Sequence, residues 1–344
     1  MTYKESAFVD KSLVVHHAFV EGLGNVGNFS NQNKITDTTH CFFNDIAVGP
    51  AGILLVACQD RFQSPPEGPN RLLVALGYGG LFDFPHVIAS TEVGIDENIA
   101  AQPNRHIGAE VGLAYDRTNI PGVGHPGRAY LVYTDEVLGA GNTDIDDTDV
   151  IVRFSDNNGG SWSSPVTVNY DDTTKSSQFL PRIAVDQTTG HVAVSWHDCR
   201  NDDGGSGAGN RKSGANNDAQ LWASISVDGG VTFQPNFQVS QGTSDEKEAE
   251  PYIINSDDLD YGDYTGLAFQ SGYFYPAWAD NSNSTEDNEQ GGATSMEIYT
   301  AKVLPEPIQI FALISGTTAL CGLYLLRVRY GGARKQPSRV GFRS

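Results

Sequence analysis

The 344-residue sequence predicts an all-β domain over residues 1–303, followed by one membrane-spanning helix in a C-terminal segment, residues 304–344. Three observations lead to this prediction. A unit of short strands recurs four times, no helical periodicity of any length occurs before Ile308, and residues 308–326 carry no charge. An uncharged run of this length can cross a bilayer as a helix, whereas repeated short strands with Gly-rich turns are typical of all-β folds.

The strand repeat predicts the architecture. Each copy has a short apolar strand, a Gly-containing turn and an alternating strand that ends in an aromatic residue or Cys, one spacer and Asp. The terminal acids are Asp60, Asp135, Asp198 and Asp280, and the residues two positions before them are Cys58, Tyr133, Trp196 and Trp278. Three or four strands per copy are typical of a β-propeller blade. A sandwich also has many short strands, but would not so naturally repeat the same order four times.

Two glycine-containing turns share a pattern. Residues 155–162 read SDNNGGSW and residues 226–233 read SVDGGVTF. Both resemble the Asp box, S-x-D-x-G-x-[ST]-W, with Asn157 in place of Asp in the first and Phe233 in place of Trp in the second. The matching residues are Ser155, Asn157, Gly159 and Trp162 in the first turn, and Ser226, Asp228, Gly230 and Phe233 in the second. Glycine supplies backbone angles that other residues resist, and Asn or Asp accepts hydrogen bonds from the turn's own amides.

The Asp boxes lead to a family resemblance. Residues 40–303 are similar to bacterial sialidase-superfamily (BNR) propellers, in which these boxes join two outer strands of a blade, away from the active site. The resemblance therefore implies a structural role for both turns and a sialidase-like β-propeller of five or six blades. Four repeats are clear, and we expect an incomplete N-terminus to account for any shortfall.

The resemblance also implies a glycosidase site. In the family, three arginines bind the substrate carboxylate, a Tyr activated by a Glu attacks the anomeric carbon, and an Asp is the acid/base. The candidate catalytic residues are Arg182, Arg200, Glu250 and Tyr264, with Arg105 and Arg128 as further arginines that could converge at the propeller's mouth. The family's early F/Y-R-I-P motif is not found, and Arg182 in FLPRIAVD lies in mid-chain. The alternative for each candidate is an ordinary salt bridge at a loop or strand end.

One acidic loop is a candidate for a cation. The segment NTDIDDTDV contains Asp144, Asp146 and Asp149, whose alternating carboxylates could hold a structural Ca²⁺. The Gly and the closing Glu of an EF-hand are missing, so a solvated acidic loop is the main alternative. No cofactor is required by any other feature of the sequence.

Charge is distributed unevenly along the chain. Six of the 22 Lys and Arg residues follow Ile308, where there is no acid, so the preceding body holds all 42 Asp and Glu residues. Such a body repels nucleic acid, which we exclude as a partner. Of the four cysteines, Cys41 and Cys58 could form a disulfide, but the sequence does not show whether they do.

The C-terminal segment resembles a sorting signal. Pro305, Glu306 and Pro307 precede the uncharged span, and Arg327 and Arg329 follow it at once. This order resembles the PEP-CTERM signal of Gram-negative bacteria, which implies an exosortase-type processing enzyme as partner, a membrane contact through the span, and a location in the cell envelope or outside the cell. The N-terminus shows no export signal. Either the true start is missing, or the span is a tail anchor and the body is cytoplasmic.

Two functions from different classes fit these features. The first is a surface propeller that binds an extracellular glycan or another envelope component without catalysis. The second is an exo-glycosidase of the exo-α-sialidase type, which acts on terminal acidic sugars. The acidic body favours the first, because it disfavours an anionic sugar.

Overall fold

The computed structural model describes residues 2–4, 12–18, 22, 25–61, 69–136, 148–169, 176–202, 217–245, 260–282 and 296–304. The chain divides into two compact units, Met1–Pro305 and Glu306–Ser344, and the second lies outside the described residues. The predicted sorting motif, Pro305 to Pro307, and the helix predicted over 308–326 also lie outside them. No helix among the described residues is long and apolar enough to cross a membrane.

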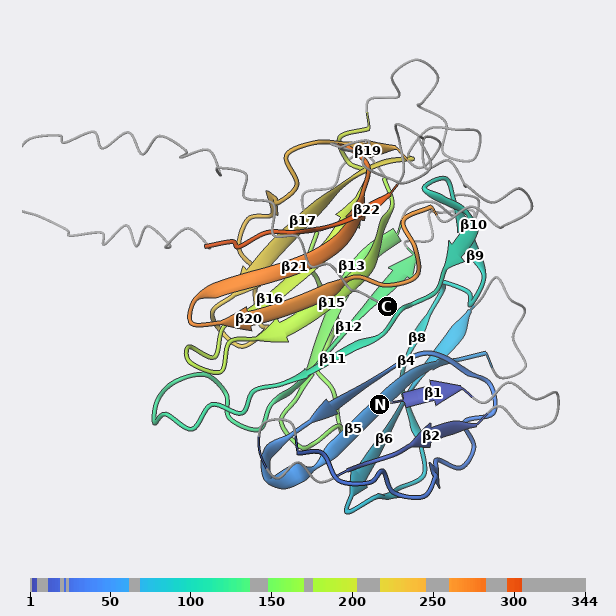
Figure 1. Cartoon of the computed structure of the whole chain (residues 1–344), viewed down its shortest axis with the longest axis vertical. Helices are drawn as coiled ribbons and strands as arrows, with labels where there is room; N and C mark the ends of the chain where they lie inside the picture. The colour runs from blue at the N-terminus through green and yellow to red at the C-terminus, as the bar shows by residue number, and fades with distance from the viewer. Residues whose placement is uncertain are drawn as a thin grey trace, which may run out of the picture. The chain divides into compact units, whose positions relative to one another are not determined.

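The described part of the first unit is all-β apart from one short 3-10 helix, Pro50–Gly52. Its strands form an N-terminal sheet, four successive antiparallel blades and a separate hairpin (Figure 1). The N-terminal sheet contains β1 (Thr2–Lys4), β2 (Leu13–Val15) and β3 (Asn33–Lys34). The hairpin contains β9 (Glu97–Ile99) and β10 (Gln102–Ile107).

The four blades follow in chain order. The first contains β4 (Cys41–Val48), β5 (Leu54–Asp60), β6 (Asn70–Tyr78), β7 (Leu81–Phe82) and β8 (His86–Thr91). The second contains β11 (Gly112–Tyr115), β12 (Ala129–Glu136), β13 (Thr148–Ser155) and β14 (Val166–Thr167). The third contains β15 (Gln178–Val185), β16 (Val192–Asp198), β17 (Asp218–Ser226), β18 (Phe237–Gln238) and β19 (Ser244–Asp245). The fourth contains β20 (Gly266–Gln270), β21 (Tyr273–Asp280) and β22 (Glu297–Thr300).

The middle blades are buried on both faces, because alternate residues of a strand point to opposite sides of a sheet. In β12, Ala129, Leu131 and Tyr133 pack with the first blade, whereas Tyr130 and Val132 pack with the third. The same alternation occurs in β16, between the second and fourth blades. A further apolar cluster joins the N-terminal sheet to the first blade. The hydrophobic core therefore consists of layers between successive sheets.

The first strand of each blade contacts the first strand of the next, so that β4, β11, β15 and β20 form a continuous series (Figure 1). We call these four the inner strands. The blade repeat predicted from the sequence is confirmed in all four copies, and so is the all-β class. A ring of five or six blades stays a prediction.

Both Asp-box turns join the third and fourth strands of a blade, at equivalent positions. In the first, Ser155 Oγ accepts a hydrogen bond from Gly159 N at 2.8 Å, and Asn157 Oδ1 accepts one from Ser161 N at 2.8 Å. In the second, Ser226 Oγ and Asp228 Oδ1 accept the corresponding bonds from Gly230 N and Thr232 N, at 2.7 and 2.9 Å. Asn157 therefore replaces Asp without loss of the turn.

The aromatic residue at the end of each Asp box packs the turn against the preceding blade. Trp162 packs on the core between the first and second blades, and Phe233 on the core between the second and third. Gly159 has a φ of +86°, and a Cβ at this position would lie 2.9 Å from Leu55 Cδ1 of the first blade. Only glycine therefore fits both the backbone conformation and the close approach.

The acids that end the second strand of each repeat have structural partners. Trp196 Nε1 donates to Asp198 Oδ2 at 2.7 Å, and Trp278 Nε1 donates to Asp280 Oδ2 at 2.9 Å. Two residues apart on a strand, the indole and the carboxylate share one face, which explains the Trp-x-Asp pattern. The recurring Asp is thus part of the blade architecture.

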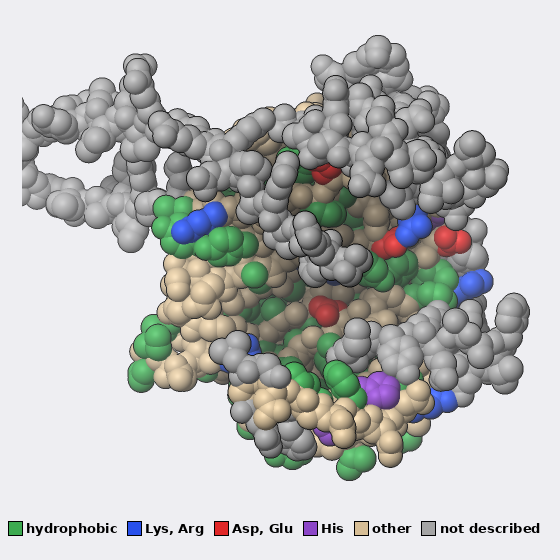
Figure 2. Space-filling view, in the orientation of Figure 1, with side chains coloured by type: hydrophobic (Ala, Val, Ile, Leu, Met, Phe, Trp, Pro, Cys, Tyr) green, Lys and Arg blue, Asp and Glu red, His purple; other side chains and the backbone are tan. Residues whose placement is uncertain are grey.

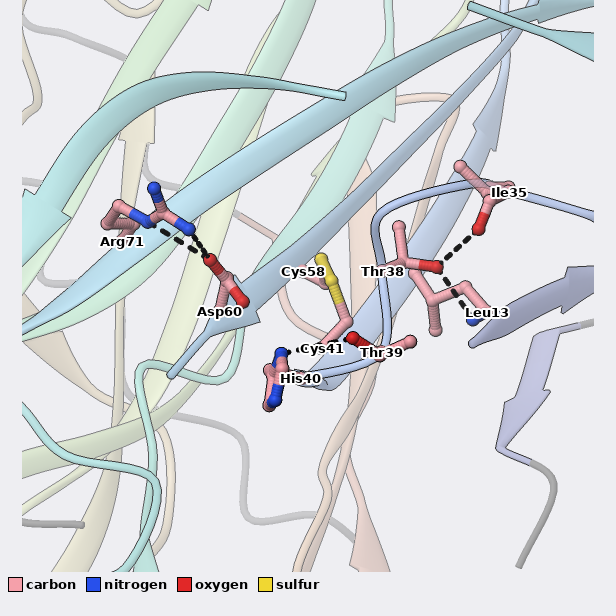
Figure 3. Close-up of a disulfide and its surroundings, with 9 residues drawn as sticks. All are labelled: Leu13, Ile35, Thr38, Thr39, His40, Cys41, Cys58, Asp60 and Arg71. Carbon is pink, nitrogen blue, oxygen red and sulfur yellow. Dashed lines mark hydrogen bonds and ion pairs between the residues drawn. A yellow bond between two sulfur atoms is a disulfide. The ribbon is translucent and has the colours of Figure 1, made fainter. Parts of the chain in front are cut away.

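Cys41 and Cys58 form a disulfide between β4 and β5 (Figure 3). Close by, Asp60 at the end of β5 pairs with Arg71 of β6. The disulfide and the Asp60–Arg71 pair link strands within the first blade. Thr38, in the segment between β3 and β4, accepts a hydrogen bond from Leu13 N of the N-terminal sheet at 2.9 Å.

Candidate ligand-binding site on the inner strands

Three of the four repeats have a kink in or just before the inner strand, at the same place in the repeat. Phe43, Glu110 and Leu180 each have a left-handed backbone, with φ of 44°, 50° and 53°. In β4 and β15, the pairing register also shifts beside this residue. A residue other than glycine costs about 1–2 kcal/mol in this conformation, and such strain tends to concentrate at functional sites. The kink brings charged and aromatic side chains together.

Arg182 lies two residues after the kink in β15 and reaches toward the fourth blade. Its Nε donates to the carbonyl oxygen of Thr265 at 3.0 Å, and its Nη1 to that of Pro181 at 3.4 Å. The guanidinium carbon lies 5.5 Å from the centre of the Tyr264 ring. Tyr264 is 61% exposed, so one large aromatic ring faces solvent beside Arg182. The structure thus brings together two residues that the sequence nominated.

Glu110 completes this group and was not nominated from the sequence. It is buried, and its Oε2 has no hydrogen-bond partner among the described residues. Burial raises the pKa of Glu110 to about 8, which the positive charge of Arg182 and hydrogen bonds from the backbone at Gly108 and Leu180 only partly offset. Its carboxyl is therefore largely protonated at neutral pH and can donate a hydrogen bond.

Asp45 occupies in β4 the place that Arg182 occupies in β15. Its two carboxyl oxygens accept hydrogen bonds from Ile46 N and Leu113 N, each at 2.8 Å, so that it bridges the first and second blades. Burial raises the pKa of Asp45, while these backbone bonds and the positive charge of Arg182 pull it down again in part. The positive charge of Arg182 thus lowers the pKa of two carboxyl groups, Asp45 on β4 and Glu110 just before β11.

A bidentate ion pair flanks Tyr264. Arg105 Nε donates to Asp263 Oδ1 at 3.1 Å, and Arg105 Nη2 pairs with Asp263 Oδ2. Desolvation raises the pKa of Tyr264, and the charges of Asp263 and Glu110 add to this effect. The phenol therefore stays protonated at neutral pH. We call Asp45, Glu110, Arg182, Asp263 and Tyr264 the inner-strand cluster.

In the view of Figure 2, the face of the molecule is hollowed near its centre, with an acidic side chain among hydrophobic ones. A pocket of about 280 Å³ is lined by residues of β4, β11 and β15 with Arg117 and Gln187. These three inner strands are therefore accessible to solvent at this pocket.

Two predicted arginines do not join the cluster. The Arg200 side chain is 8% exposed and pairs with the buried Asp198, with its guanidinium over the Trp222 ring. Arg128 pairs with Asp156, the second residue of the first Asp box. The contacts of both arginines are structural, so the expected convergence of Arg128 and Arg200 with Arg182 is not found among the described residues.

The remaining candidates are placed only in part. Glu250, Asp144 and Asp146 lie outside the described residues. Asp149 lies on β13, where its Oδ1 accepts a hydrogen bond from Asn169 Nδ2 at 2.6 Å. Within the described ranges, no group of three or more His, Cys, Asp and Glu residues is arranged to hold a metal ion.

Comparison with known proteins gives a similarity to solved structures alone, since no family model and no curated protein matches the chain. A Hadza microbial sialidase matches over 76% of this chain and 44% of its own length, with 11% identity and a TM-score of 0.44. The GH93 α-L-arabinofuranosidase of Fusarium graminearum, in complex with arabinobiose, matches over 78% and 63%, with 10% identity and a TM-score of 0.42. An N-acetylgalactosamine deacetylase from F. plautii matches over 88% and 84%, with 12% identity and a TM-score of 0.43.

This chain therefore spans less than two thirds of the length of the first two proteins. At such identities and TM-scores, the similarity assigns no activity to it.

Proposed function

We propose that this chain is a glycan-binding propeller protein, and that the ligand binds over Tyr264 at the inner-strand cluster. The observation that carries the proposal is the exposed Tyr264 ring held against Arg182, with the carboxyl groups of Asp263 and Glu110 in electrostatic range. Arg182 lies on the inner strand β15, and the other three residues lie just before the inner strands β11 and β20.

Sugars suit such a surface. Their C–H faces pack on aromatic rings, and their hydroxyl groups exchange hydrogen bonds with carboxyl groups and with a phenol. Ligand sites combine an apolar contact with a few convergent polar groups, and the cluster offers both. The Tyr264 hydroxyl and the Glu110 carboxyl are both protonated at neutral pH, so the site holds donors as well as acceptors.

A glycan array with the purified chain tests this proposal. We expect Tyr264→Ala to weaken binding about tenfold or more, and Tyr264→Phe to retain most of it, because the ring stays. Tyr78, an exposed tyrosine on the outer strand β6, provides the matched control, since Tyr78→Ala removes an equal ring elsewhere. Binding that is absent, or that Tyr264→Ala and Tyr78→Ala reduce equally, contradicts the proposal.

A second candidate function, exo-glycosidase activity, is favoured by Glu110. A buried carboxyl that is protonated at neutral pH can act as a general acid, and Glu110 lies within electrostatic range of Tyr264. Release of 4-methylumbelliferone from its glycosides, including the α-sialoside, tests this function. Turnover that Glu110→Gln and Tyr264→Phe abolish would make the chain an enzyme; no turnover with retained glycan binding supports the first function.

We also propose that the body acts in the bacterial cell envelope or outside the cell, with an exosortase-type enzyme as its processing partner. The order of Pro305, Glu306, Pro307, the uncharged span and the basic tail supports this location. The Cys41–Cys58 disulfide agrees with it, because disulfides persist in oxidising compartments.

A further inference from the structure

The arginines beside the proposed glycan site already have oxygen partners. Arg182 donates to the carbonyl oxygens of Thr265 and Pro181. Arg105 holds the carboxylate of Asp263 in a bidentate pair. Among the described residues, the Arg105 guanidinium is therefore occupied by a carboxylate of the protein itself, whereas Arg182 is held by backbone carbonyl oxygens.

The Arg105–Asp263 pair bears directly on ligand choice. Asp263 precedes Tyr264, so the pair lies beside the ring on which the ligand would pack. A guanidinium offers its paired N–H donors to one planar carboxylate at a time in the bidentate arrangement. The Asp263 carboxylate occupies these paired donors of Arg105, to which the carboxylate of an acidic sugar would otherwise bind.

We propose that Asp263 determines the specificity of this site: by occupying Arg105 with a carboxylate of the chain, it directs the site to neutral glycans and excludes glycans whose terminal sugar carries a carboxylate. This inference rests on the proposed glycan-binding function. An incoming carboxylate would meet the Asp263 carboxylate as a like charge, which an interface uses to reject wrong partners. A neutral sugar meets no such repulsion, because its hydroxyl groups donate hydrogen bonds to the same oxygens.

Matched glycans give a direct test. Reduction of the carboxyl groups of sialic and uronic acids to primary alcohols yields pairs of glycans that differ only at this group, which loses its negative charge. On an array that carries both forms, we expect the wild-type chain to bind the reduced form at least about tenfold tighter than the parent. Parent glycans that bind as tightly as the reduced forms, in a manner that Tyr264→Ala abolishes, would overturn the inference and leave the proposed function intact.

Variants assign the effect to Asp263. Asp263→Asn frees the Arg105 guanidinium and removes one negative charge, so we expect the tenfold preference to disappear. We expect Asp263→Asn to gain affinity for carboxylated glycans. The double variant Asp263→Asn with Arg105→Gln should lose this affinity again. If Asp263→Asn alone folds and keeps the wild-type preference, Asp263 does not determine the specificity.

The chain offers a matched control for the charge change. Arg128 and Asp156, the second residue of the first Asp box, form a second bidentate pair, with Nε–Oδ1 at 2.7 Å and Nη2–Oδ2 at 2.9 Å. Asp156→Asn makes the same substitution away from Tyr264 and should leave the preference unchanged. If Asp263→Asn does not fold, Asp263→Ser makes the same test of the role of Asp263, and a wild-type chain without the preference overturns the inference in either case. If the wild-type chain binds no glycan through Tyr264, the proposed function fails, and this inference with it.

Discussion

Trp162 Nε1 donates a hydrogen bond to the carbonyl oxygen of Gly159 at 3.1 Å. The indole thereby closes the first Asp-box turn on itself while its ring packs between the first and second blades. The same carbonyl also bonds to the His86 ring at 2.8 Å, on β8 of the first blade. The box therefore connects the first and second blades. It lies at the turn between the third and fourth strands of its blade, away from the inner-strand cluster.

We expect Trp162→Ala to lower the melting temperature without changing the glycan affinity of the folded protein. Truncation of a large buried aromatic costs about 3–5 kcal/mol, and Trp162 is half-buried, so the lower end applies. Differential scanning calorimetry and glycan titration measure the two effects. Trp162→Phe keeps most of the packing and should lose less stability. A selective loss of binding at unchanged melting temperature would place the box in the site.

Glu110 should make the fold less stable as pH rises from about 4.5 to about 8. Its folded pKa of about 8 exceeds its ordinary value of 4.5, so only the folded state holds the proton in this window. One proton corresponds to a slope of up to about 1.4 kcal/mol per pH unit. Urea unfolding of the wild-type chain and of Glu110→Gln should therefore give stabilities that diverge with rising pH, in favour of the variant. Parallel curves would show that Glu110 is ionised in the folded protein.

His197 should make the fold less stable as pH falls, which is the opposite of the effect expected for Glu110. Its ring is buried, stacked on Phe179 at 5.3 Å between ring centres, and burial lowers its pKa from 6.5 to about 4. As pH falls from 6.5 to 4, the unfolded chain takes up a proton that the folded chain does not, so stability falls. His197→Phe keeps the stacking and should remove this acid sensitivity between pH 4 and 6.5. If the variant retains the full acid slope, the titration belongs to another group.

Processing of the C-terminal segment is a separate prediction. Expressed with its native upstream sequence in hosts with and without exosortase, the protein should lose its tail only when the enzyme is present. Mass spectrometry of the mature chain shows whether the tail has been cleaved off. Digestion by protease added to intact cells shows whether the body lies outside the cell. A tail retained in both hosts, with a body shielded from protease, would mean a simple anchor and a cytoplasmic body.

The sequence predicted the blades better than the site, for physical reasons. A blade depends on local patterns, such as alternation in HVAVSWHD and the turn from Ser155 to Trp162, and both are visible along the chain. The site depends on contacts between strands that are distant in sequence. Glu110 could have been found by aligning AEVGLAYD with FLPRIAVD, since it then falls at the kink position of Leu180. The burial of Arg200 and the formation of the Arg105–Asp263 ion pair both depend on how distant segments pack, which a single sequence does not reveal.

The most direct test of the central claim is a crystal structure of the chain soaked with the glycan that binds best on the array. The glycan-binding account predicts a sugar ring packed on Tyr264, with hydroxyl groups in hydrogen-bond range of carboxyl groups of the inner-strand cluster. A well-occupied glycan bound elsewhere, such as at the Asp boxes or on the outer strands around Tyr78, with the Tyr264 ring left free, would contradict it.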